Sequence, residues 1–92
     1  MKREQIAKNI VADLKELASL TSDADGAQRI AWTPTFKKAT EWFTQKMQAA
    51  GAEVWTDAAG NSWAKFAGES EECIVIGSHL DSVPDGGWLD GA

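Results

Sequence analysis

The chain has 92 residues, enough for one small domain or for part of a larger one. Its 9 Lys and Arg stand against 14 Asp and Glu, a formal net charge of −5, which argues against nucleic acid and anionic membranes as partners because both attract basic surfaces. No stretch approaches the roughly 20 apolar residues that span a bilayer, and no signal-peptide core follows the basic start. Since a single cysteine permits no internal disulfide, we expect a cytoplasmic protein.

Apolar residues at spacings of three and four predict a first helix from about residue 3 to about residue 20. Its apolar face, which we expect to lie in a core, consists of Ile6, Ile10, Val11, Leu14, Leu17 and Leu20. A polar loop with turn chemistry follows at residues 21–26. A second helix is predicted to begin near Thr33 and Pro34, because threonine caps free amides and proline suits the first turn. Gly51 is expected to end it.

Beyond the second helix the hydrophobic pattern becomes that of strands. Residues 52–56 and 61–66 alternate well enough for two short strands, with a turn at residues 57–60 between them. Residues 73–76 form a continuous apolar run, typical of a buried central strand, which makes Cys73 a core residue rather than a nucleophile. Two helices followed by three strands predict an α/β fold with an incomplete sheet.

The residue types that carry chemistry gather after this apolar run. His79, the one histidine, is followed by Asp81 and, beyond a glycine-rich loop, by Asp90. Imidazole and carboxylate together suit zinc or manganese. In an extended segment, residues i and i+2 point the same way, so Asp81 can take the free ring N–H and orient His79. Because a carboxylate has two oxygens, Asp90 can bridge two cations that together lower the pKa of a shared water.

The run from Gly77 to Ala92 closely resembles the first metal-binding motif of the M20-type metallopeptidase and amidohydrolase group. It is most similar to the branch that cleaves N-carbamoyl amino acids, β-ureidopropionate and allantoate. A weaker resemblance extends upstream, through the stretch at residues 29–34, the second helix and the turn at residues 57–61, so that it covers nearly the whole chain.

The resemblance implies a role for each residue of the motif. His79 would bind one metal, Asp90 would bridge two, and Asp81 would act in catalysis by orienting His79. The cofactors would be two divalent ions, of zinc, manganese, cobalt or nickel. Residues 1–92 would form the amino-terminal part of a di-metal, phosphorylase/hydrolase-like catalytic domain. The general-base glutamate, the other ligands and the domain that makes the enzyme a homodimer would lie downstream.

The expected activity of the intact protein is hydrolysis of a non-peptide C–N bond in N-carbamoyl amino acids or related ureido acids. These substrates are small molecules, and the fragment alone is expected to be inactive because it lacks a base and several ligands. One alternative keeps the site but makes the enzyme a dipeptidase or aminoacylase of the same group. Another is a truncated, non-catalytic remnant or a binding piece for a partner chain.

Three further residues have less specific interpretations. Asp85 lies in a Pro-Asp-Gly-Gly turn, and we assign it no function. Trp88 is expected to pack the loop rather than line a substrate pocket. Arg29 can either hold a substrate carboxylate or pair with a surface acid, and the second interpretation is favoured.

Overall fold

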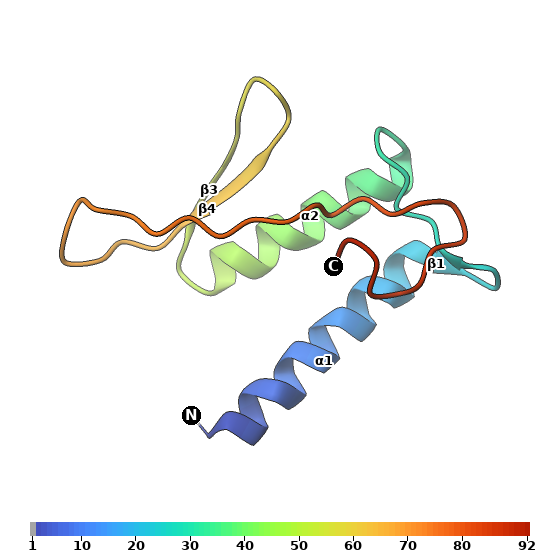
Figure 1. Ribbon diagram of the computed structural model, residues 1–92, viewed down its shortest axis with the longest axis horizontal. Coiled ribbons are helices and arrows are strands. Elements are labelled where there is room, and N and C mark those ends of the chain that lie inside the picture. Colours follow the sequence, from blue (N-terminus) through green and yellow to red (C-terminus); the bar gives the residue numbers. More distant parts are fainter. Residues whose placement is uncertain (1) are drawn as a thin grey trace. The chain divides into compact units, whose positions relative to one another are not determined.

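A computed structural model describes residues 2–92, which fall into two compact units. One unit comprises the chain up to residue 39 together with residues 78–92, and the other comprises residues 40–77. The elements within these residues are two helices and two strand pairs, and Figure 1 shows them with the segment that follows residue 65. The two helices and the antiparallel strand pairs agree with the coarse α/β expectation, whereas the catalytic fold of which they would be part remains a prediction.

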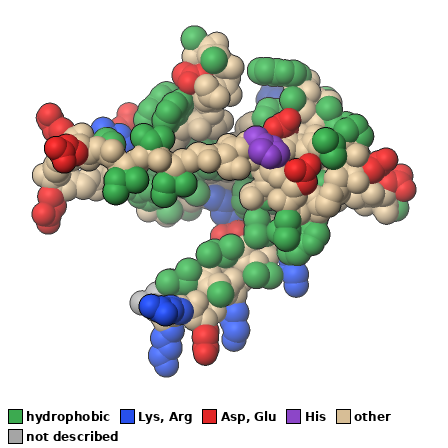
Figure 2. Space-filling model, viewed as in Figure 1, with side chains coloured by type: hydrophobic (Ala, Val, Ile, Leu, Met, Phe, Trp, Pro, Cys, Tyr) green, Lys and Arg blue, Asp and Glu red, His purple; other side chains and the backbone are tan. Residues whose placement is uncertain are grey.

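Helix α1 extends over Arg3–Thr21, as the periodicity predicts. The prediction that its apolar face lies in a core is wrong for most of the helix, because only Leu17 and Thr21 are buried. The exposed apolar side chains include Ile6, Ile10, Val11 and Leu20, and green side chains are visible along this helix in Figure 2. An apolar stripe is buried only where another surface covers it, and the structure provides that cover only at the last turns of α1.

The predicted polar loop after α1 contains a small hairpin. Strands β1 (Ser22–Asp23) and β2 (Gly26–Ala27) pair antiparallel. The Asp23 carboxylate accepts the N–H of Asp25 at 2.9 Å, an arrangement that lets an aspartate side chain stabilise a turn. This hairpin leads directly into the segment that contacts the motif.

Helix α2 extends over Pro34–Ala49, and both of its predicted end signals are confirmed. The Thr33 hydroxyl accepts the N–H of Phe36 at 3.2 Å, which satisfies one of the free amides of the first turn. At the other end Gly51 has a φ of 96°, and the N–H of Ala52 donates to the carbonyl of Met47 at 2.9 Å. A left-handed glycine with this bond is a common helix end.

The second unit contains the predicted pair of strands, β3 (Glu53–Thr56) and β4 (Ser62–Lys65), which are antiparallel. Trp55 and Trp63 lie opposite each other, with ring centroids 6.0 Å apart and rings 6° from parallel. The Asp57 carboxylate organises the turn. It accepts the backbone N–H groups of Ala59 and Asn61 at 3.0 and 2.9 Å and the Trp63 indole N–H at 2.9 Å.

The predicted central strand at residues 73–76 is wrong. This segment has no regular secondary structure, and Ile74, Val75 and Ile76 are 93%, 70% and 92% exposed. Cys73 is likewise exposed rather than a core residue. A central strand exists only when neighbouring strands accept its backbone groups and cover its side chains, and residues 2–92 supply none.

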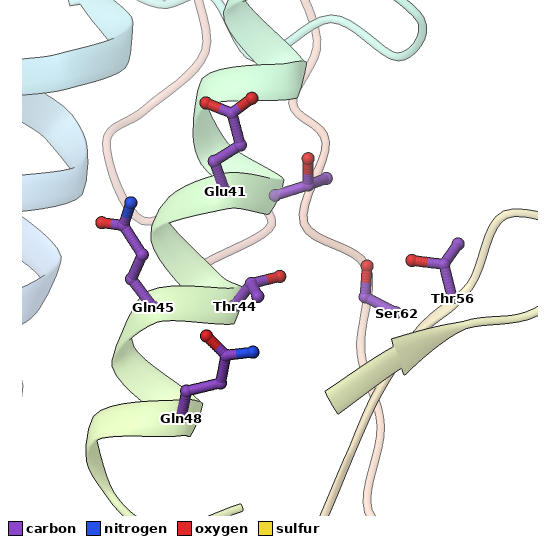
Figure 3. A pocket seen from close by; sticks show the side chains of 7 residues that line it. Glu41, Thr44, Gln45, Gln48, Thr56 and Ser62 are labelled. Carbon is purple, nitrogen blue, oxygen red and sulfur yellow. The ribbon is translucent and has the colours of Figure 1, made fainter. Parts of the chain in front are cut away.

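The second unit also has an open pocket between α2 and the hairpin (Figure 3). Its lining is polar and consists of Thr40, Glu41, Thr44, Gln45, Gln48, Thr56 and Ser62. Ligand sites are generally concave and mostly apolar with a few placed polar groups. The lining contains no aromatic or aliphatic side chain, and we assign it no role.

Candidate functional site

Residues 78–92 of the candidate motif lie in the first unit, where strand β2 contacts their loop. The N–H of Ala27 donates to the carbonyl of Gly86 at 2.8 Å, and the N–H of Gly86 donates to the carbonyl of Ala27 at 3.0 Å. A Cβ on Gly26, whose φ is 135°, would lie 2.6 Å from the Gly86 oxygen. Only glycine allows this close approach of two backbones.

Gln28, the residue after β2, binds both the carboxylate and the backbone N–H of Asp85. Its side-chain amide donates to the Asp85 carboxylate at 2.7 Å, and its amide oxygen accepts the Asp85 N–H at 3.1 Å. Asp85 has a φ of 56°, a left-handed conformation that aspartate tolerates better than most residues. Asp85 therefore shapes the turn, in agreement with its interpretation as a turn residue.

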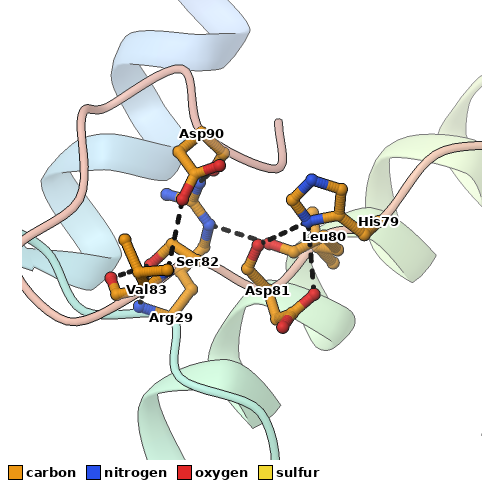
Figure 4. Close-up of polar contacts among 7 residues, drawn as sticks. All are labelled: Arg29, His79, Leu80, Asp81, Ser82, Val83 and Asp90. Carbon is orange, nitrogen blue, oxygen red and sulfur yellow. Dashed lines mark hydrogen bonds and ion pairs between the residues drawn. The ribbon is translucent and has the colours of Figure 1, made fainter.

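Arg29 is fully buried and binds the main chain of the motif (Figure 4). Its backbone N–H donates to the Ser82 hydroxyl at 3.1 Å, and its carbonyl accepts the Ser82 N–H at 2.8 Å. Its guanidinium donates from Nε to the carbonyl of Leu80 at 3.0 Å and from Nη2 to the carbonyl of Asp90. The favoured expectation of a surface ion pair is therefore wrong for Arg29.

Burial lowers the pKa of Arg29, and the nearby carboxylates of Asp90 and Asp81 oppose that change. The cause of the lowering is that a charged group loses its hydration when it leaves water. A guanidinium remains protonated through the accessible pH range, so the first unit has a buried positive charge beside the two motif acids.

His79 and Asp81 are brought together, as predicted from their i, i+2 spacing. The Nδ1 atom of His79 lies 2.8 Å from the Asp81 carbonyl oxygen and 3.3 Å from its carboxylate Oδ1. With the proton on Nδ1, the ring donates to the backbone oxygen, the nearer of the two. The sequence suggests only the Asp81 carboxylate as the partner of the ring N–H, and the structure shows that the Asp81 carbonyl is a second partner.

This contact leaves Nε2 of His79 as the ring nitrogen that a metal would use. Among residues 2–92 it has no hydrogen-bond partner, and the side chain is 60% exposed. Figure 2 shows the purple imidazole at the surface with red carboxylate atoms near it. A metal-binding histidine commonly donates its other ring N–H to a carbonyl or carboxylate, so the donor set at His79 fits a divalent cation.

Asp90 is held at the far end of the loop. Its Oδ2 atom accepts the N–H of Val83 at 3.2 Å, and its own carbonyl binds Arg29. The next residue, Gly91, has a φ of 71°, and a Cβ there would lie 2.0 Å from the Asp81 carbonyl oxygen and 2.9 Å from Nδ1 of His79. The backbone after Asp90 is thus packed against the His79–Asp81 pair.

The three motif side chains do not all meet at one point. In the part of the chain that the structure describes, the group of metal-ligating side chains whose ligand atoms lie within 4.8 Å of one another is Asp23, Asp25 and Asp85. These three acids are exposed, and exposed carboxylates often cluster at turns without a cation. The metal-binding roles of His79 and Asp90 and the orienting role of Asp81 remain predictions.

Compared with known proteins, the chain matches amidohydrolases. It is 36% identical over 87 residues to an N-carbamoyl-L-amino-acid amidohydrolase of Paenarthrobacter aurescens, a match that covers 92% of this chain. It is 39% identical over 85 residues to allantoate deiminase 1 of Glycine max, covering 89% of the chain. It is 35% identical over 78 residues to the allantoate amidohydrolase of Escherichia coli K12, covering 82%.

These matches confirm the resemblance that the motif indicates, to the N-carbamoyl-amino-acid and allantoate amidohydrolases. The chain spans only about one fifth of their length, between 17% and 21% of the three relatives named. No protein-family profile matches the chain. No solved structure matches it either. No helix in the described residues is long and apolar enough to cross a membrane.

Proposed function

We propose that the protein is a metal-dependent amidohydrolase that cleaves a non-peptide C–N bond in N-carbamoyl amino acids or related ureido acids. The observation that carries the proposal is the His79–Asp81 pair, whose Nδ1 contact leaves Nε2 free. This pair lies in a chain that matches relatives named for these substrates, and the matches cover 92% and 82% of the chain.

In this proposal each residue has a stated part. Nε2 of His79 and the Asp90 carboxylate hold divalent cations, while Asp81 fixes the tautomer of His79 through Nδ1. The cations, when bound, supply the Lewis acidity that polarises a carbonyl and lowers the pKa of water. Hydrolysis of an N-carbamoyl amino acid would release the amino acid, ammonia and carbon dioxide. Proton transfer also requires a general base, a role that this proposal assigns to no residue among 2–92, because Asp81 is engaged with Nδ1 of His79.

The test uses the full-length protein, stripped of metal and then reloaded with zinc, manganese, cobalt or nickel. Ammonia release would be followed with N-carbamoyl amino acids and allantoate, and release of the free amino acid would be followed with a dipeptide and an N-acetyl amino acid. We expect activity on the ureido substrates only after metal is restored. Activity that survives exhaustive chelation would refute metal dependence, and turnover of the dipeptide or N-acetyl substrate alone would favour the peptidase or aminoacylase alternative.

Substitutions connect that activity to the motif. His79→Gln and Asp90→Asn should each lower kcat/KM by at least about 10-fold, because losing a ligand costs no less than losing an outer partner of a ligand. Asp85→Asn is the matched control, an exposed acid of the same loop whose carboxylate accepts a bond from Gln28. An equal loss in all three variants would show that the loop, rather than its ligands, had been damaged.

A further inference from the structure

The two ends of the metal motif are connected by one buried side chain from a distant part of the sequence. Arg29 lies 51 residues before Leu80 and 61 residues before Asp90, and it binds the main-chain carbonyl of each. Leu80 stands between His79 and Asp81, while Asp90 is the other proposed ligand. Arg29 therefore contacts the backbone at both places where the site has its functional side chains (Figure 4).

The geometry of these contacts suits arginine rather than any other cation. The Nε–H and the neighbouring Nη2–H lie along one edge of the planar guanidinium and donate in a fixed fork. With one carbonyl on each prong, the group sets the separation of the two backbone segments. A lysine has one flexible ammonium and cannot fix both oxygens in the same way.

Burial makes this arrangement specific. Arg29 is fully buried, and its Nη1 atom has no hydrogen-bond partner within residues 2–92. A buried charge is costly unless it is paired or hydrogen-bonded, and the neighbouring acids Asp81 and Asp90 supply opposite charge. A residue needed only for loop packing could be apolar. The charged, forked side chain of Arg29 therefore indicates that it serves to bind the two carbonyls and to lie beside the two acids.

We propose that Arg29 is the positioning residue of the metal centre, which fixes the backbone of the His79–Asp81 segment relative to the backbone of the Asp90 segment. The inference rests on the proposed function, since it takes His79 and Asp90 as ligands. Arg29 touches neither substrate nor metal; it acts through the backbone of the residues that do. Its loss affects metal binding first and turnover as a consequence.

The experiment measures cobalt binding to the metal-free, full-length protein by titration calorimetry and by visible absorption, which reports ligand geometry. Arg29→Met removes both donors at similar size, and Arg29→Lys keeps the charge without the fork. Arg3→Lys, on the exposed first turn of α1, is the matched arginine control. Leu17→Ala serves as a stability control because Leu17 is a buried residue of the same unit.

We expect Arg29→Met to weaken cobalt binding 10- to 100-fold, the range for groups that orient metal ligands, and to change the absorption band. Arg29→Lys should lie between Arg29→Met and wild type, and Arg3→Lys should match wild type. Leu17→Ala should lower the melting temperature with little change in cobalt affinity. If Arg29→Met fails to fold, Arg29→Lys decides the question.

Two results would overturn the inference while leaving the proposed function intact. One is cobalt affinity within twofold of wild type in the Arg29 variants. The other is an equal loss of affinity in Leu17→Ala at a matched loss of melting temperature. A wild-type protein that binds no cobalt, or binds it equally well after His79→Gln, would instead refute the proposed function, and the inference with it.

Discussion

Gly91 shows how closely single residues define the site. Its φ of 71° is left-handed, and its Cα faces the Asp81 carbonyl oxygen and Nδ1 of His79 so closely that a Cβ would lie 2.0 and 2.9 Å from them. The sequence indicates only that glycine follows Asp90. The structure shows that the absence of a side chain there allows the Asp90 end of the loop to lie against the His79–Asp81 pair.

Gly91→Ala is therefore expected to displace the Asp81 carbonyl and to break its contact with Nδ1 of His79. The left-handed backbone alone costs an L-residue about 1–2 kcal/mol, and the steric clash adds to that cost. Chemical denaturation of the full-length protein should show a loss of at least about 1 kcal/mol, and NMR should show an altered His79 ring. A stable protein with an unchanged ring would contradict the expectation.

Gly87→Ala is the control in the same loop. A Cβ on Gly87 meets nothing within 4 Å, so this substitution should change neither the stability nor the His79 signals appreciably. A similar loss in both variants would mean that the loop requires glycine for general flexibility rather than for the contact at Gly91.

At the scale of elements, the β3–β4 hairpin depends on the carboxylate of Asp57. Hydrogen bonds from the Trp63 indole, then from the Asn61 side chain and from backbone amides, lower the pKa of Asp57 from 3.8 to about 2. Each bond favours the ionised form. A folded-state pKa below the unfolded value means that ionisation favours the folded hairpin.

The sign of the resulting pH dependence follows from linkage. The contribution of Asp57 is fully present above the unfolded pKa near 3.8 and is lost as the pH falls toward the folded value of about 2. The hairpin should therefore loosen between about pH 4 and pH 2. The shift of the Trp63 indole proton by NMR follows this titration, and a midpoint near 3.8 would show that these hydrogen bonds do not lower the pKa of Asp57.

Replacing the tryptophans one at a time separates that hydrogen bond from ring stacking. Trp63→Phe removes the indole N–H and should raise the pKa of Asp57 toward 3.8, since its largest cause is lost. Trp55→Phe disturbs the same stacked pair but keeps the donor, so it should leave the pKa of Asp57 nearer 2. Carboxyl NMR titration would read both variants. An equal rise in the pKa of Asp57 in both variants would show that ring stacking, and not the indole hydrogen bond, is responsible for the low pKa.

At the scale of the whole molecule, local features were predictable and long-range ones were not. The bounds of α1, α2 and the hairpin follow from periodicity and from caps such as Thr33 and Gly51, which depend on neighbours in sequence. The i, i+2 contact of His79 with Asp81 is equally local. Arg29 was misassigned because its partners lie more than 50 residues away, and no pattern in its neighbourhood identifies them.

The run at residues 73–76 was predicted wrongly for a related reason. Its apolar, β-branched composition is that of a buried strand, but a strand forms only with neighbours, and composition does not supply them. The exposed fractions of 93%, 70% and 92% at Ile74, Val75 and Ile76 are high for contiguous apolar residues. Such a surface is typical of a segment that requires further polypeptide to cover it.

Hydrogen exchange tests this interpretation. In the 92-residue chain, the amides of residues 74–76 have no hydrogen-bond partner in the described structure, so they should exchange at rates near those of an unfolded peptide. The exposed Cys73 thiol should react with a disulfide reagent without prior unfolding. In the full-length protein we expect both to be protected, because a central strand bonds its amides to neighbours and buries its side chains. Protection in the short chain would mean that residues 73–76 already pair within it. Rapid exchange in the full-length protein would mean that the run is not a strand there, and that the motif after it begins from a loop.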